Sequence, residues 1–165
     1  MFRIVLDSDG LIKLEKSGML RVLCKTHTCI IPEGVFEETV KQGKIELYAD
    51  AFRLEEEIKG KVEVKEAAEN FRATEITKGK SLGKGEREVL HLFFNETADA
   101  IVSDDRSFLN LLEEKGIAFL NPAKAIVFLK RKDRIKKEEA LEALNKIKEL
   151  IRKDVYEKAK EEVGK

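Results

Sequence analysis

The chain has 165 residues, a length that favours a single domain with a substantial hydrophobic core. Lysine plus arginine and aspartate plus glutamate both number 32, so the net charge is zero, which excludes the globally basic surface of many nucleic-acid binders. No apolar stretch approaches the ~18 residues needed to span a bilayer, no secretory signal is visible, and the abundance of glutamate and lysine is typical of thermophile proteins. We therefore expect a soluble cytoplasmic protein, with Cys24 and Cys29 as buried apolar residues.

The first predicted element is a strand over residues 2–6, a short apolar run rich in β-branched residues that is typical of a strand buried on both faces. Asp7 and Asp9 follow at once, and Gly10 lets the chain turn into a helix. Open α/β sheets bind ligands at the carboxyl ends of their strands, so Asp7 is the first candidate site residue. The alternative is that Asp7 or Ser8 only caps the next helix.

The later segments alternate between strand and helix patterns. Further strands are predicted at residues 28–31, 62–64, 99–103 and 117–120. Helices are predicted at residues 11–16, 33–42, 45–59, 86–95, 106–115, 122–132 and, as one long helix, 136–161, whereas residues 67–80 are undetermined. This alternation indicates an α/β fold with a parallel sheet and helices on both faces.

Glu86 is unusual because it lies on the apolar face of the helix predicted at residues 86–95. Val89, Leu90 and Phe93 follow it at three, four and seven residues. A carboxylate that points toward the core is costly unless a metal ion or another partner compensates it. The alternative is a first-turn glutamate that the helix dipole favours and that reaches water around the helix end.

Asp104 and Asp105 follow the strand predicted at residues 99–103, as Asp7 follows the first strand. These acids can converge at one edge of the sheet, where they would repel one another unless a divalent cation neutralised them. Ligands that are all oxygen suit Mg²⁺ or Mn²⁺. Glu37 and Glu38 flank the apolar stripe of the helix predicted at residues 33–42 on opposite sides, and the periodicity does not choose between them.

Taken together, the motifs resemble those of the PIN-domain nucleases, a family that includes the ribonuclease toxins of toxin–antitoxin pairs. The resemblance covers the chain to about Leu129, and the matching segments are residues 4–7, 31–38, 85–89 and 102–108. It implies a three-layer α/β/α nuclease domain over residues 1–132, with a central parallel sheet of about four to five strands. Residues 133–165 would form a helical C-terminal extension packed on the same domain.

The same resemblance implies functional residues and partners. Asp7, Glu38, Glu86 and Asp104 or Asp105 would be the catalytic residues and the ligands of one or two Mg²⁺ or Mn²⁺ ions. The implied activity is metal-dependent hydrolysis of RNA, with single-stranded DNA as an alternative substrate and products that carry a 5′-phosphate. The implied protein partners are a second copy in a homodimer and, for a toxin, an antitoxin.

Two other functional classes compete with this interpretation. Asp7-Ser8-Asp9-Gly10 fits the opening motif of haloacid-dehalogenase-type phosphatases, with Asp7 as nucleophile and Asp9 as general acid. That assignment leaves the positions of Glu38 and Glu86 unexplained. The other class is a non-catalytic nucleic-acid-binding module in which the acids are structural.

The remaining charged residues give weaker signals. Lys13, Lys84 and Arg106 neighbour the acidic motifs and are candidates for binding substrate phosphates, although exposed lysines are more often ordinary surface. The basic run at residues 130–137 is interpreted as a solvated junction between helices. His27 and His91 have no partner at ligand spacing and are interpreted as structural.

Overall fold

The computed structural model describes all 165 residues and contains one parallel sheet with the strand order β3-β2-β1-β4-β5. The strands are β1 (Arg3–Leu6), β2 (Thr28–Pro32), β3 (Val62–Lys65), β4 (Ala100–Val102) and β5 (Phe119–Leu120). The predicted α/β class and parallel sheet are confirmed, although β5 is only half as long as predicted. The central strand β1 pairs with β2 on one side and β4 on the other.

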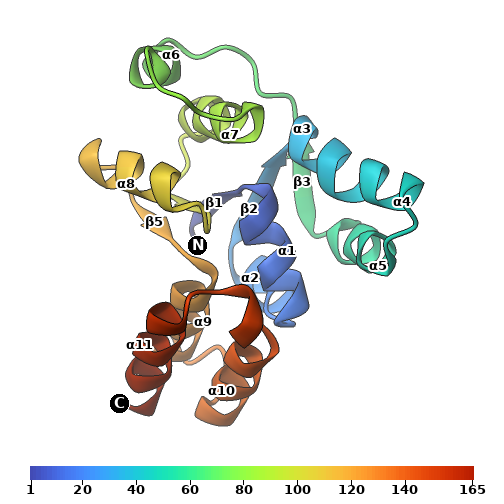
Figure 1. The fold of residues 1–165 in the computed structure, drawn as a ribbon, viewed down its shortest axis with the longest axis vertical. Helices are drawn as coiled ribbons and strands as arrows, with labels where there is room; N and C mark the ends of the chain where they lie inside the picture. Colours follow the sequence, from blue (N-terminus) through green and yellow to red (C-terminus); the bar gives the residue numbers. More distant parts are fainter.

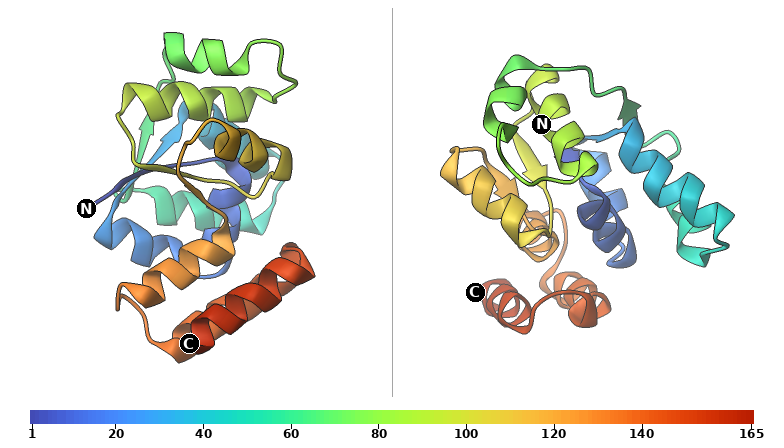
Figure 2. Two further views of the ribbon diagram at one scale, coloured as in Figure 1. Left: turned by 90° about the vertical axis from the view of Figure 1, so that its left-hand side faces the viewer. Right: turned by 45° about the horizontal axis from the view of Figure 1, so that its top comes forward.

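Helices cover both faces of the sheet, as Figures 1 and 2 show. On one face lie α1 (Ser8–Lys16), α2 (Leu20–Thr26), α5 (Ala49–Ile58) and α9 (Pro122–Arg131). On the other face lie α6 (Phe71–Thr77), α7 (Lys84–Asn95) and α8 (Arg106–Glu114). The connections from β1 to β2 and from β3 to β4 therefore cross opposite faces, as right-handed crossovers that run in opposite directions require.

The first turn of α1 lies directly against the end of β4. A Cβ atom on Gly10 would be 2.6 Å from the carbonyl oxygen of Val102, so any other residue here would collide with backbone. The backbone N–H of Asp7 donates to the same carbonyl, at 3.1 Å. This close approach places Asp7 beside the residues that follow β4.

The helix predicted at residues 33–42 forms and extends to residue 45, with an unexpected π-helical centre. Its parts are α3 (Glu33–Phe36), the π-helix η1 (Glu37–Gln42) and α4 (Gly43–Ile45). The hydroxyl of Thr39 donates to the carbonyl oxygen of Val35 at 2.7 Å inside this stretch. Short π-helical segments frequently occur at functional sites, and this one contains Glu38.

Two neighbouring predictions need adjustment. The helix predicted at residues 45–59 begins only at Ala49, because Leu47 takes a positive φ of 58° in the intervening turn. The undetermined segment contains α6, whose start is capped by the side chain of Asn70, 3.0 Å from the N–H of Arg72. The N–H of Asn70 in turn donates to Nδ1 of His91 at 2.9 Å, which gives this histidine a structural contact.

The long helix predicted over residues 136–161 is wrong. The chain instead forms α10 (Lys137–Lys146), the 3₁₀ turn η2 (Lys148–Leu150) and α11 (Lys153–Gly164), with Ile151 extended between them. The two helices pack side by side against α9 (Figure 2), and the hydroxyl of Tyr156 lies 2.6 Å from Oδ1 of Asn145. Neither glycine nor proline marks the break, so the turn depends on the burial of α11 rather than on a local stop signal.

One continuous cluster of buried apolar side chains extends from Ile4 in β1 to Val163 in α11. Residues 133–165 therefore share the core of the rest of the chain. Ile4, Val5 and Leu6 are at most 2% exposed, because β1 is covered on both faces and paired on both edges. None of the helices combines the length and apolar character that a membrane span requires.

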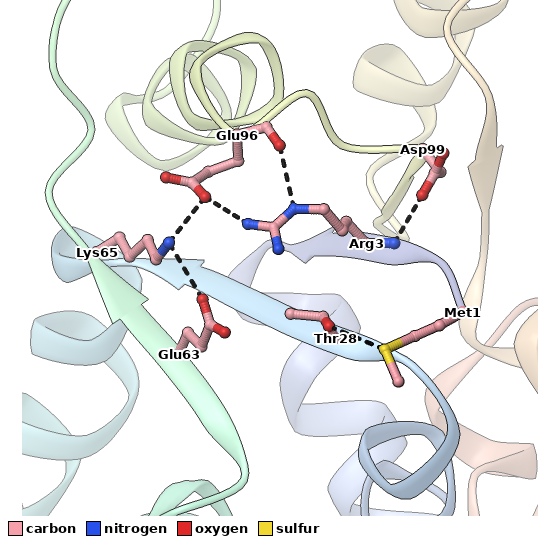
Figure 3. Close-up of polar contacts among 7 residues, drawn as sticks. All are labelled: Met1, Arg3, Thr28, Glu63, Lys65, Glu96 and Asp99. Atoms are coloured by element: carbon pink, nitrogen blue, oxygen red, sulfur yellow. Dashed lines mark hydrogen bonds and ion pairs between the residues drawn. The ribbon is translucent and has the colours of Figure 1, made fainter.

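A polar network fixes the carboxyl end of α7 to the sheet (Figure 3). Nε of Arg3 on β1 donates to the backbone carbonyl of Glu96 at 3.1 Å, and Nζ of Lys65 on β3 lies 2.8 Å from the Glu96 carboxylate. Lys65 also pairs with Glu63, at 3.2 Å. The hydrogen bonds from Lys65 and Arg3 lower the pKa of Glu96. Such partly exposed pairs are individually weak, but together they restrain the helix whose other end carries Glu86.

Candidate active site

A cavity of about 650 Å³ lies at the carboxyl edge of the sheet, beside the end of β1. It is lined by residues from three segments: Asp7, Ser8 and Asp9 after β1; Gly34, Glu37, Glu38, Lys41, Gln42 and Ile45 on the helix of residues 33–45; and Gly83, Lys84, Gly85, Glu86 and Glu88 at the start of α7. Six of these residues are acidic, two are lysines, and only Ile45 is hydrophobic. The cavity is therefore strongly acidic although the whole chain is neutral.

Asp7 is the buried carboxylate of this cavity, with a relative exposure of 4%. It caps α1 by accepting a hydrogen bond from the N–H of Gly10 at 2.8 Å, and it also accepts one from the hydroxyl of Ser103 after β4. Asp7 thus lies where crossovers leave the sheet in opposite directions, which is the usual ligand-binding position in open α/β sheets. Helix capping and a place in the cavity are therefore compatible roles for this residue.

The environment of Asp7 disfavours its negative charge. Burial raises the pKa of its carboxyl to about 7, and the hydrogen bonds from Ser103 and Gly10 offset this only in part. The nearby carboxylates of Asp9 and Glu86 raise the pKa further. No lysine or arginine forms an ion pair with Asp7, so a cation from outside the chain would relieve an existing electrostatic cost.

Glu38 and Glu37 lie next to each other on the π-helix but make different contacts. An oxygen of Glu38 accepts a hydrogen bond from the hydroxyl of Ser8 at 2.7 Å. The same oxygen lies 3.9 Å from where a Cβ atom on Gly85 would be, so Glu38 reaches across the cavity toward α7. Glu37 is exposed at the cavity and pairs with Lys41 on its own helix. Of the two, Glu38 is the one joined to the segment that follows Asp7.

Glu86 lies in the first turn of α7, which begins two residues earlier than predicted. Its carboxylate folds back over Gly83, where a Cβ atom would be 2.5 Å from Oε2. The half-buried side chain lies at the N-terminus of its own helix, where the helix dipole favours a negative charge, and it also lines the cavity. The two interpretations of Glu86 made from the sequence are therefore compatible.

Asp104 and Asp105 do not line the cavity. The carboxylate of Asp104 forms a partly buried ion pair with Lys13. The carboxylate of Asp105 caps α8, accepting at 2.8 Å from an amide in its first turn. The N–H of Asp105 donates to the Ser103 hydroxyl at 3.1 Å, so this segment contacts the cavity through the serine.

The three basic residues proposed from sequence also differ in their surroundings. Lys84 lines the cavity and is 86% exposed. Lys13 is only 16% exposed because its ammonium group is bound to Asp104. Arg106 is exposed at the start of α8, outside the cavity lining. Lys41, which sequence reasoning did not single out, adds a second lysine to the lining.

Sequence reasoning also missed Glu88. This residue lies one turn inside α7, lines the cavity, and has a buried Oε2 atom with no hydrogen-bond partner. No periodicity distinguishes it from an ordinary surface glutamate, because its burial depends on the approach of Gly34 from a distant segment. Ser103 carried a better signal, since it is a small hydroxyl residue directly before two acids at a strand end.

The donor chemistry of the cavity fits a hard divalent cation. As arranged in the structure, no three acidic, histidine or cysteine side chains lie close enough together to hold an ion, so the carboxylates must rotate toward one another to do so. A bound cation would give the Glu88 carboxylate a partner and would stabilise the negative charge of Asp7, which burial disfavours. All the acidic donors are oxygens, as Mg²⁺ and Mn²⁺ prefer.

Comparison with known proteins agrees with this architecture. No curated protein and no solved structure gives a significant match. A family model described as a PIN domain matches residues 3–165, which includes every cavity residue and also the helices after residue 132. Because that match covers nearly the whole chain, the protein belongs to the PIN-domain family.

Proposed function

We propose that this protein is a metal-dependent nuclease that hydrolyses phosphodiester bonds in RNA at the cavity beside Asp7. PIN domains are generally nucleases. The single observation that carries the proposal is the buried Asp7 carboxylate, which no basic side chain compensates and which shares its cavity with Glu38 and Glu86. Carboxylates from three different segments around one cavity are an arrangement suited to Mg²⁺ or Mn²⁺.

In this proposal Asp7, Glu38 and Glu86 hold the cation. When bound there, a divalent cation would lower the pKa of a water molecule and offset the charge that develops on the phosphate. Ser103 orients the Asp7 carboxylate, and Ser8 orients that of Glu38. The proposal also includes one of the two acids after β4 as a ligand. To reach the cation, that acid must leave its present contact with Lys13 or with the α8 amide.

The substrate must meet positive charge at the rim of an acidic cavity. Lys84 lies at that rim and Arg106 at the adjacent start of α8, and both are exposed. Phosphate contacts of this kind position a nucleic acid without reading its sequence. RNA is the proposed substrate, with single-stranded DNA as the alternative. A toxin role, an antitoxin partner and a homodimer stay predictions from the family resemblance.

The test is a cleavage assay on RNA, single-stranded DNA and a small phosphate monoester, with Mg²⁺ or Mn²⁺ and with a chelator. We expect cation-dependent cleavage of RNA that Asp7→Asn abolishes and Asp9→Asn largely retains. Asp9 is the informative control because the phosphatase alternative requires both aspartates. Hydrolysis of the monoester alone, lost equally in both variants, would reject the nuclease proposal.

A further inference from the structure

Glu88 is the one carboxylate of the protein with a buried oxygen that lacks any hydrogen-bond partner. Its other oxygen lies 3.7 Å from Nζ of Lys84, a side chain that is 86% exposed. A pair of this length with an exposed lysine contributes little and leaves Oε2 unsatisfied. Buried polar atoms in native proteins nearly always have a partner, which can be a water molecule or an ion.

The position of the Glu88 carboxylate depends on a glycine in another helix. A Cβ atom on Gly34 would be 2.1 Å from Oε2 and 2.9 Å from Oε1, so the carboxylate occupies the space that a side chain on α3 would take. Because Gly34 is only four residues before Glu38, this contact places the Glu88 carboxylate between its own helix, α7, and the helix that carries Glu38.

The acids after β4 offer a contrast. Asp104 is neutralised by Lys13, and Asp105 is satisfied by an amide of α8. Both would have to break an existing contact to bind a cation. Glu88 lines the cavity already and has only the weak Lys84 pair to lose.

We propose that Glu88 is a further ligand of the divalent cation, together with Asp7, Glu38 and Glu86. This inference rests on the proposed function, since it concerns the same cavity. α7 then supplies two carboxylates, spaced two residues apart, from its first two turns. To bind the ion, the Glu88 carboxylate must rotate away from Gly34, just as the other acids of the cavity must rotate toward one another.

A purely structural role for Glu88 makes a different prediction. The carboxylate lies near the N-terminus of α3, where negative charge is favoured, so a structural glutamate would stabilise the protein without metal. In that case Glu88→Gln lowers the stability of the metal-free protein. A ligand instead carries an electrostatic cost until the ion binds, so Glu88→Gln leaves the metal-free protein equally stable or more stable and reduces the stabilisation that Mn²⁺ adds.

The experiment is calorimetric titration of the metal-free, full-length protein with MnCl₂, combined with thermal unfolding with and without Mn²⁺. The variants are Glu88→Gln, Asp7→Asn and the control Glu33→Gln. Glu33 is exposed, precedes Gly34 in α3 and does not line the cavity, so its variant removes the same charge from the same region. We expect Glu88→Gln to weaken Mn²⁺ binding by about tenfold or more, as loss of a ligand or its support does, and Glu33→Gln to have little effect.

The outcomes separate this inference from the proposed function. If Asp7→Asn abolishes Mn²⁺ binding while Glu88→Gln and Glu33→Gln behave alike, the Glu88 inference is overturned and the nuclease site stands. If Glu88→Gln lowers metal-free stability without weakening Mn²⁺ binding, the structural role is correct and the inference is overturned. If the unaltered protein binds no Mn²⁺, both the inference and the proposed function fail.

Discussion

Ser103 donates a hydrogen bond from its hydroxyl to Oδ2 of Asp7, and both side chains are buried at the edge between β1 and β4. The same hydroxyl accepts a hydrogen bond from the N–H of Asp105. One serine thus connects the carboxylate at the end of β1 to the loop after β4, and it fixes the direction in which Asp7 faces the cavity. The bond also opposes the increase in the pKa of Asp7 that burial causes.

Replacing Ser103 by Ala should weaken both the fold and the site. We expect a loss of about 1–3 kcal/mol in the free energy of unfolding, because buried groups lose their partner, together with weaker Mn²⁺ binding and slower cleavage. Ser17→Ala is the matched control, since Ser17 is also buried and its hydroxyl donates to the Leu14 carbonyl, away from the cavity. Urea denaturation and Mn²⁺ titration of both variants distinguish a local role from a general one. Equal Mn²⁺ affinity in the two variants would contradict the orienting role of Ser103.

The raised pKa of Asp7 predicts how the stability of the metal-free protein depends on pH. The carboxyl has a pKa of 3.8 when unperturbed and about 7 in the folded protein, so between these values the folded state holds a proton that the unfolded state has lost. Stability should therefore fall as pH rises from about 4 to about 7 and level off above, with a total change on the order of 4 kcal/mol from this residue.

Asp7→Asn should remove that pH dependence. At pH 8 without metal, the variant should be more stable than the unaltered protein, because the asparagine oxygen still caps α1 and carries no buried charge. Urea denaturation in a chelator from pH 4 to pH 8 measures the difference. If the unaltered protein loses no stability relative to the variant across this range, the pKa of Asp7 is not raised in the folded protein and this prediction is wrong.

The two acids after β4 should respond differently to replacement by asparagine. Asp105→Asn should leave the stability of the protein unchanged, since asparagine caps a helix as well as aspartate does. As the loss of a cation ligand, it should lower turnover. Asp104→Asn leaves Lys13 partly buried without its partner, so it should destabilise the protein by about 1 kcal/mol or more while retaining most of the turnover. Stability and kcat measured on the same preparations decide between them. The reverse pattern would make Asp104 the ligand.

The position of the substrate can be tested with two exposed arginines at opposite edges of the sheet. Arg106 lies at the carboxyl edge, whereas Arg134 belongs to the basic run near Phe128, whose ring lies 6.0 Å from that of Phe2 before β1. Arg106→Ala should raise KM more than it lowers kcat and reduce the salt dependence of RNA binding by about one unit of slope. Arg134→Ala should change neither quantity. A loss of binding in Arg134→Ala alone would place the RNA path over the C-terminal helices.

Much of the fold was predictable because it depends on local patterns. The apolar run before Asp7 and its abrupt end identify the central strand and its carboxyl edge, and four strands paired in parallel follow from the alternation of elements. The break between α10 and α11 was not predictable in this way. The apolar stripe of the sequence continues across the turn, and the turn is stabilised by the contact of Tyr156 with Asn145.

In the candidate site, the sequence identified individual acidic residues but not the contacts between distant segments. Asp7, Glu38 and Glu86 were singled out because each breaks a local rule at a strand end or on an apolar helix face, and all three line the cavity. The pairing of Lys13 with Asp104 joins residues 91 positions apart, and no local pattern reports it. The burial of Glu88 similarly depends on a glycine in another helix.

The π-helix at Glu37–Gln42 changes the rotational phase of the helix that carries Glu38. Val35 and Val40 are both at most 1% exposed, yet residues five apart on an α-helix point about 140° away from each other. Five residues are close to one full turn of a π-helix, so both valines face the core together. Deleting Phe36 or Glu37 would give the two valines the four-residue spacing of an α-helix and would rotate Glu38 relative to Val35, so the direction of Glu38 toward Ser8 depends on the π-helical turn.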